Sequence, residues 1–141
     1  MIQFEKIFNT WLHNTLTTST IPANVTAYCF NLASPAGHEN DGIFDIQLIG
    51  APQFLPNDED WACDAVWEPI ENNLLIPLSY STKDWEVCLD KMHQLIKQIL
   101  VSENDATKLL KRSEAVAIGF VDGDLKLIWV NPMSNIINET N

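Results

Sequence analysis

WEVCLDKMHQLIKQIL, residues 85–100, is the stretch that decides the fold. Its apolar residues recur every three or four positions, which is the period of an α-helix with one buried face. They are Trp85, Cys88, Leu89, Met92, Leu95, Ile96, Ile99 and Leu100. Ser81 or Thr82 is the expected N-cap, and Asp84 and Glu86 suit the positive end of the helix dipole. A helix of this kind needs a sheet or other helices to cover its apolar face.

The chain before this helix predicts one more helix and three strands. Residues 2–16 show helical apolar spacing, whereas AYCFNLA (27–33) and IFDIQLIG (43–50) alternate apolar and polar residues as strands do. These two strands are expected to pair in antiparallel fashion across a turn. LLIPLS (74–79) is a short strand at an edge or bulge, because Pro77 has no backbone donor.

The chain after this helix predicts a short helix at 106–112 and a hairpin, AVAIGFVDGDLKLIWV, at 115–130. Asp122 and Gly123 suit the two central positions of a type I′ turn. The turn would give three cross-strand pairs whose side chains share one buried face: Phe120 with Leu125, Ile118 with Leu127, and Val116 with Trp129.

The predicted order of elements is therefore α-β-β-β-α-α-β-β. This order indicates an α+β fold, in which an antiparallel sheet of about five strands is packed on one face by helices. The length of 141 residues fits a single domain spanning residues 1–141, and no internal repeat is present.

The net negative charge of the chain argues against several classes of partner. The chain has 19 acidic and 8 basic residues and a net charge of −11, which disfavours nucleic acids and anionic membranes. No apolar run is long enough to cross a membrane, and the first residues lack the apolar centre of a signal peptide. We therefore expect a cytoplasmic protein.

The acidic residues are also distributed unevenly along the chain. Between Lys6 and Lys83 there is no lysine or arginine. The same interval holds nine acidic residues: Glu39, Asp41, Asp45, Asp58, Glu59, Asp60, Asp64, Glu68 and Glu71. A general solubility charge could explain the total, but the one-sided distribution favours a basic partner.

The acids concentrate in PNDEDWACDAVWEP, residues 56–69, within a long connection at 51–73. Three interpretations are open: a carboxylate metal site, a solvated loop, or a surface for a basic protein. The acids lack the spacing and the central glycine of a calcium loop, which weakens the first. Trp61 and Trp67 could pin the loop onto the edge of the sheet, or one or both of them could anchor a partner.

Signals for catalysis are weak, so no catalytic residue, metal or cofactor is expected. The three cysteines are odd in number and have no C-x-x-C spacing. A pair of Cys29 or Cys88 with His93 has no recognisable third residue to orient it. Asp122 and Asp124 look like a carboxylate pair, but the hairpin turn explains them better.

DEDWACDAVW (58–67) and AVAIGFVDGDLKLIW (115–129) resemble small bacterial immunity proteins of polymorphic toxin systems, over about residues 42–130. The resemblance implies a cytoplasmic, non-catalytic protein. Such a protein would neutralise a cognate basic toxin domain by occluding the active site or the basic substrate cleft of the toxin. We expect a monomer or a weak homodimer.

Under this interpretation the acids would make electrostatic contacts with the toxin. The predicted partner-binding residues are Asp58, Glu59, Asp60, Trp61, Asp64, Trp67, Glu68, Glu39 and Asp41. An alternative is an acidic chaperone like those of type III secretion, which share a similar order of elements, or another protein-interaction module. A small enzyme is the third possibility.

Overall fold

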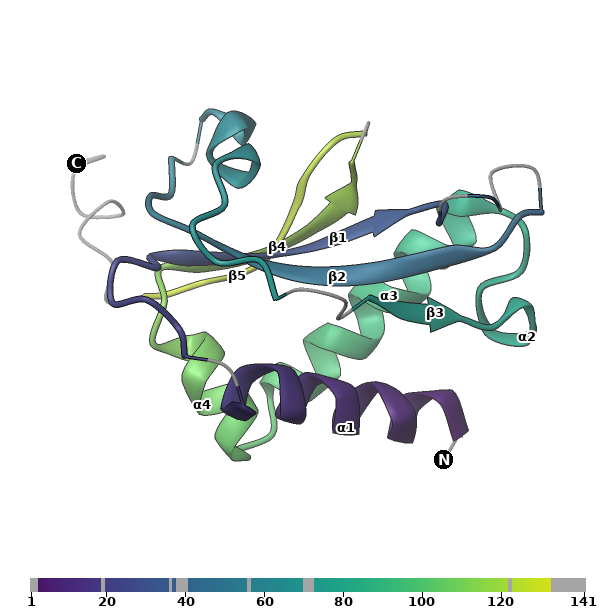
Figure 1. Ribbon diagram of the computed structural model, residues 1–141, viewed down its shortest axis with the longest axis horizontal. Coiled ribbons are helices and arrows are strands. Elements are labelled where there is room, and N and C mark those ends of the chain that lie inside the picture. Colours follow the sequence, from purple (N-terminus) through teal and green to yellow (C-terminus); the bar gives the residue numbers. More distant parts are fainter. Residues whose placement is uncertain are drawn as a thin grey trace.

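A five-stranded sheet with helices packed on one face forms the body of the protein (Figure 1). The computed structural model describes residues 3–18, 20–35, 37, 41–55, 57–69, 73–121 and 123–132. In chain order the elements are α1 (Gln3–Thr18), β1 (Ala27–Ala33), β2 (Phe44–Ala51), the 3-10 helix η1 (Glu59–Cys63), β3 (Leu74–Ile76), α2 (Leu78–Ser81), α3 (Trp85–Leu100), α4 (Asp105–Lys111), β4 (Ala115–Phe120) and β5 (Lys126–Val130). The α+β class and the five strands are confirmed.

The sheet is mostly antiparallel, as expected, but one of its pairings is parallel. The strand order is β3-β2-β1-β4-β5, and β1 pairs with β4 in parallel while the other three pairings are antiparallel. After β3 the chain passes through α2, α3 and α4 before it enters β4 beside β1 (Figure 1). A helical crossover of this kind brings the chain back in the original direction, so the pairing is parallel. The expected antiparallel arrangement is therefore confirmed for three pairings, and the pairing of β1 with β4 differs from it.

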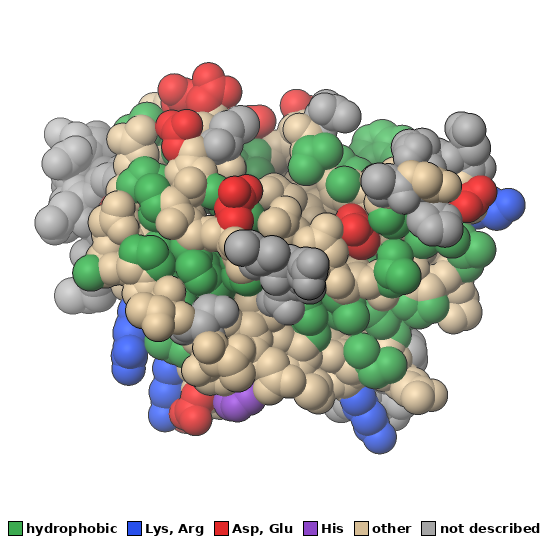
Figure 2. All heavy atoms as spheres, viewed as in Figure 1, with side chains coloured by type: hydrophobic (Ala, Val, Ile, Leu, Met, Phe, Trp, Pro, Cys, Tyr) green, Lys and Arg blue, Asp and Glu red, His purple; other side chains and the backbone are tan. Residues whose placement is uncertain are grey.

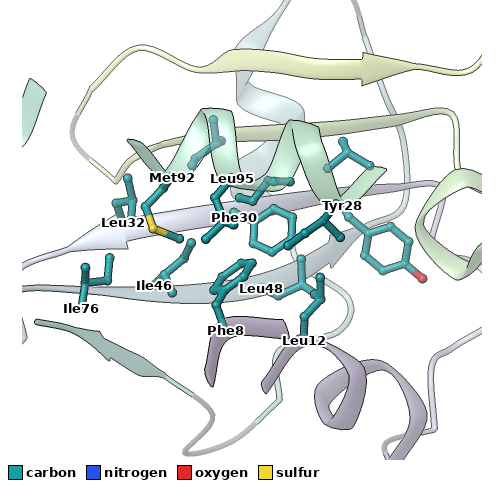
Figure 3. Close-up of a cluster of buried hydrophobic side chains, with 14 of the residues drawn as sticks. Phe8, Leu12, Tyr28, Phe30, Leu32, Ile46, Leu48, Ile76, Met92 and Leu95 are labelled. Atoms are coloured by element: carbon teal, nitrogen blue, oxygen red, sulfur yellow. The ribbon is translucent and has the colours of Figure 1, made fainter. Parts of the chain in front are cut away.

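The main core lies between the helices and the sheet. Phe8 of α1, Phe30 of β1 and Met92 of α3 are each fully buried there, and Figure 3 shows their side chains converging from two helices and the sheet. The predicted stripe of α3 is buried from Cys88 to Leu100. The exception is Trp85, which is 53% exposed because it stands at the first residue of the helix.

The start of α3 differs from the expectation. Asp84 is the N-cap, and its carboxylate accepts a hydrogen bond of 2.9 Å from the backbone N–H of Glu86. The expected caps lie upstream, because Ser81 belongs to α2 and Thr82 is its C-cap. Pro77 is the N-cap of α2, so the edge strand β3 ends one residue before it.

The second hairpin contains a β-bulge that the sequence pattern did not predict. Val116 pairs with Trp129 as expected, but Ile118 pairs with Lys126 and Ala117 with Leu127. The extra residue lets the consecutive side chains of Ile128 and Trp129 both pack against the main core. Leu127 consequently lies on the opposite face and is 42% exposed, which corrects the expected grouping of six apolar residues.

The turn of this hairpin also differs from the expected arrangement. The backbone N–H of Gly123 donates to the carbonyl of Phe120 at 2.9 Å. This bond closes a four-residue turn that begins at Phe120, so Gly123 is its last residue. In the expected type I′ turn Gly123 would be the second central residue. Asp122 lies outside the described residues.

None of the helices within the described ranges combines the length and the apolar character needed to cross a bilayer. Each of the two long helices instead has one buried and one exposed face. Most apolar residues of α1 and α3 face the sheet and most of their polar residues face solvent; the exceptions include the exposed Ile7 and Trp85 and the buried Thr15.

Replacing Leu95 with alanine should lower the free energy of unfolding by about 2–5 kcal/mol, because it leaves a cavity between α3 and the sheet. Chemical denaturation followed by circular dichroism measures the change. Val101→Ala at the end of the same helix is the matched control. Val101 is 79% exposed, so its replacement should change stability by less than about 0.5 kcal/mol. Equal effects of the two changes would contradict the packing described for α3.

Two buried groups make stability sensitive to alkaline pH. Burial raises the pKa of the Cys88 thiol from 9.0 to about 12. Burial, and then the charge and hydrogen bond of Glu5, raise the pKa of the Tyr80 hydroxyl to about 12. Each group stays protonated in the folded protein at a pH where it ionises in the unfolded chain. Their contribution is therefore complete below the unfolded pKa and is lost as pH rises towards the folded value.

We expect the free energy of unfolding to fall between about pH 8 and about pH 10.5, and to fall less in Cys88→Ala than in the wild type. Denaturant titrations of both proteins at the two pH values test this. The variant removes one of the two groups and keeps the other. A loss of stability of the same size in both proteins would show that the Cys88 thiol ionises as readily when folded as when unfolded.

Candidate functional site

The face of the sheet opposite the helices carries a second, smaller hydrophobic cluster. Its sheet residues are mostly small. Two aromatic rings from the connection between β2 and β3 lie on top of them. The cluster consists of Ala27, Cys29, Ile49, Ala51, Phe54, Trp61, Ala115 and Ala117. Phe54 and Trp61 meet edge to face with centroids 5.4 Å apart. Because the sheet residues are small, the chain's own connection covers this part of the face closely.

The connection then turns around the edge of β2. β3 pairs only with Phe44–Ile46 of β2, so the rest of that edge is open to the connection. Trp67 forms an isolated bridge with Gly50 there, and its ring meets Tyr28 edge to face at 5.9 Å in the main core. A Cβ on Gly50 would lie 2.8 Å from a methyl group of Val25 and 3.3 Å from the Trp67 ring. Only glycine leaves room for this crossing.

We call residues 57–69 the acidic loop. Trp61 is 2% exposed on one face of the sheet and Trp67 is 6% exposed on the other, so the loop is held from both sides. The two tryptophans pin the loop from within. This agrees with the interpretation in which the two tryptophans pin the loop onto the sheet, and with 2% of Trp61 and 6% of Trp67 exposed they offer little surface to a partner.

The predicted acidic residues of the loop are on the surface. They are Asp58, Glu59, Asp60, Asp64 and Glu68, and all five are exposed. Figure 2 shows acidic side chains gathered at the top of the view, where Figure 1 places η1. The structure therefore brings together the part of the predicted site that lies between Asp58 and Glu68.

Other predicted acids lie elsewhere. Asp41 is exposed in the connection between β1 and β2 and not in the acidic loop, and Glu39 and Glu71 lie outside the described residues. Asp45 is buried and accepts a hydrogen bond of 3.0 Å from the side-chain amide of Asn73. It therefore adds nothing to the charge of the surface around the loop.

Two acids of the loop also organise it. The Asp58 carboxylate accepts a hydrogen bond of 3.0 Å from the backbone N–H of Asp60 and so caps η1. The Glu59 carboxylate accepts one of 3.2 Å from the backbone N–H of Leu125, which lies just before β5. The loop and the second hairpin are thus joined by a side chain that itself carries charge.

A groove of about 410 Å³ lies between the acidic loop and this hairpin. We call it the loop groove. Asn31 and Ile49 of the sheet line it, together with Glu59, Asp60 and Glu68 of the loop. Phe120, Val121 and Leu125 of the hairpin complete the lining. Its described lining includes three carboxylates and no lysine or arginine.

The basic side chains lie mainly in the helix layer. Lys6 belongs to α1, Lys91 and Lys97 to α3, and Lys108 and Lys111 to α4. Lysine or arginine side chains extend from the helix side at the bottom of Figure 2, away from the acids at the top. The field above the loop groove is therefore negative, and it attracts basic groups and repels phosphates.

The structure offers little geometry for covalent chemistry. Across the described residues between Gln3 and Pro132, no three His, Cys, Asp or Glu side chains are placed to hold a metal ion. Burial raises the pKa of the Cys88 thiol to about 12, which keeps it protonated and a poor nucleophile near neutral pH. What the arrangement does present to solvent is a group of exposed carboxylates beside a groove.

One surface residue was assigned to the wrong environment from the sequence. Trp85 continues the apolar stripe of α3, so periodicity predicted that it is buried, but it is far more exposed than Trp61 or Trp67. A signal was present, because Asp84 and Glu86 flank it and a helix begins at Trp85. A side chain in the first turn can extend beyond the edge of the sheet that its helix covers.

No family model, curated protein or solved structure matches this chain. Three features of the molecule bear on its function. They are the pinned acidic loop, the loop groove and the concentration of exposed acids without lysine or arginine around that groove.

Replacing Gly119 with alanine should destabilise the protein by about 1–3 kcal/mol, because a Cβ there would lie 2.8 Å from the carbonyl oxygen of Asp124. The backbone at the tip of the hairpin would have to move. Gly123→Ala is the control, since its Cβ would lie 3.6 Å from Phe120, which is an ordinary contact. Thermal unfolding measures both, and equal stability of the two variants would contradict the close packing at Gly119.

Proposed function

We propose that this protein is a non-catalytic, acidic binding protein that neutralises a cognate toxin domain, as an immunity protein does. The acidic loop would cover the active site or the basic substrate cleft of the toxin. The observation that carries this proposal is that buried tryptophans on both faces of the sheet fix a loop with five exposed acids.

A fixed loop favours tight binding for an entropic reason. A flexible loop loses conformational freedom when a partner orders it, and this loss subtracts from the affinity. Trp61 and Trp67 order the acidic loop during folding instead. The carboxylates are thus presented in one arrangement before the partner arrives.

Charge supports a basic partner in particular. A net charge of −11, separated so that the loop side is acidic, accelerates the encounter with a basic protein through long-range attraction. Toxins that act on nucleic acids or other anionic substrates have basic clefts, and an acidic surface competes with such substrates. The protein would act in the cytoplasm, where an immunity protein protects the cell that makes the toxin.

The loop groove alone is too small to be the whole interface. Stable complexes bury about 800 Å² on each partner. The toxin would therefore also cover the crest of the acidic loop and the neighbouring hairpin, whose Val121 is 61% exposed. An exposed apolar residue beside acids fits the usual arrangement of an apolar centre and a charged rim.

Charge removal from the loop tests the proposal. The double variant Glu59→Gln, Asp60→Asn keeps the shape of both side chains, and the amide oxygen introduced by Glu59→Gln can still accept the hydrogen bond from Leu125. We expect its association rate with the toxin domain encoded beside it to fall by about tenfold, because long-range attraction is reduced. Stopped-flow measurements at low and high salt measure the rate.

Glu103→Gln, Asp105→Asn is the matched control. It removes the same charge from Glu103 in the connection between α3 and α4 and from Asp105, the first residue of α4, on the helix side of the sheet. It should change the association rate by less than about twofold. If the loop variant and this control behave alike, the acidic loop is not the interface. If co-expression of the wild-type protein fails to protect cells from the neighbouring toxin, the immunity function is excluded.

A further inference from the structure

A second groove, of about 660 Å³, lies on the other side of the second hairpin. We call it the Trp85 groove. Trp85, Glu86, Leu89 and Asp90 of α3 line it, as do Asp124 and Lys126 of the hairpin. Three carboxylates and one ammonium group thus surround an indole that is 53% exposed.

The two grooves are neighbours. Phe120 and Gly123 line both of them, so the tip of the hairpin is the ridge that separates them. A partner that contacts the acidic loop and covers this ridge reaches the Trp85 groove as well. The exposed Val121 lies on the ridge and gives the shared surface an apolar centre.

The ring of Trp85 is supported from the core. Phe44 packs edge to face on Phe120 at 5.2 Å, and Phe120 packs edge to face with Trp85 at 5.8 Å. These contacts hold the indole in place while about half of the side chain stays in contact with solvent. An exposed, immobilised indole beside carboxylates suits the guanidinium group of arginine, which is a planar cation. The guanidinium can stack on the ring while its N–H groups reach the acids.

We propose that the Trp85 groove receives an arginine side chain of the partner protein, whose segment crosses the hairpin ridge from the acidic loop. The proposal rests on the proposed function and names the chemistry of its partner. Arginine fits better than lysine, because the guanidinium is weakly hydrated and stacks on aromatic rings, whereas the ammonium group is strongly hydrated.

The composition of the chain argues against a second copy as the occupant. The chain contains one arginine, Arg112. It is the C-cap of α4, and its positive charge interacts with Tyr28 of β1. Two copies would also bring two charges of −11 together, which opposes association. A basic partner of different sequence meets neither obstacle.

Hexa-arginine and hexa-lysine peptides are the probes for this surface. We expect hexa-arginine to shift the indole N–H signal of Trp85 in NMR spectra, with the assignment made from Trp85→Phe. Trp85→Ala should weaken hexa-arginine binding by about fivefold, whereas hexa-lysine binding should change by less than about twofold. Trp85→Phe keeps a ring and should recover part of the loss.

A charge-matched pair of variants completes the design. Glu86→Gln removes one carboxylate from the groove, and Glu103→Gln removes one from the connection beyond α3. Hexa-arginine should bind more weakly to the first variant than to the second. Unchanged affinity in Trp85→Ala, or an indole signal of Trp85 that does not move, would overturn the proposal.

The outcomes separate this proposal from the proposed function. If Glu59→Gln, Asp60→Asn slows toxin binding but Trp85→Ala does not affect hexa-arginine, the groove assignment fails and the acidic loop keeps its role. If Trp85 responds to the peptide but no toxin is bound, the immunity function fails and the groove remains. A dimer that dissociates in Trp85→Ala, measured by sedimentation, would assign the surface to a second copy and overturn the proposal.

Discussion

The parallel pairing of β1 with β4 is the constraint on which the rest of the structure depends. It joins the part of the chain that begins at α1 to the part that ends at β5, and it places β1 in the middle of the sheet. Side chains of β1 are therefore buried on both faces: Phe30 in the main core and Cys29 in the smaller cluster. The helices occupy one face because the crossover runs there, and the other face is left to the connection after β2. The acidic loop belongs to that connection, so its part around Trp61 lies on the face of the sheet that the helices do not cover.

The sequence predicted the long helices and the five strands, because the periodicity of their apolar residues is local information, but it missed the short helices η1 and α2, and the strand expected at 74–79 ends at Ile76. It did not predict the pairing of β1 with β4, because a long crossover leaves no mark on the alternation of a strand. The bulge in the second hairpin was missed for a related reason. Both Ile128 and Trp129 pack against the core, and strict alternation allows only one of two consecutive residues to do so.

The candidate surface was predicted in part. A long, base-free stretch of acids with no ligand spacing indicated a partner-facing loop, and the structure places its acids on the surface. For the aromatic residues, the sequence left open whether Trp61 and Trp67 pin the loop or anchor a partner, and it wrongly predicted that Trp85 is buried. Trp61 and Trp67, in an irregular and acidic segment, are buried, whereas Trp85, in a regular apolar stripe, is exposed. Burial in a loop depends on what the loop covers, and burial at a helix terminus depends on where the sheet ends. Neither is visible in the spacing of residues.

The two tryptophans of the acidic loop separate the residues that hold the backbone from those that face outward. Trp61 and Trp67 carry the packing, while Asp60, Asp64 and Glu68 project into solvent. Exchanging an outward residue consequently changes the chemical character of the surface without repacking the interior. Such a loop can acquire a new binding preference through a few substitutions while its scaffold stays constant.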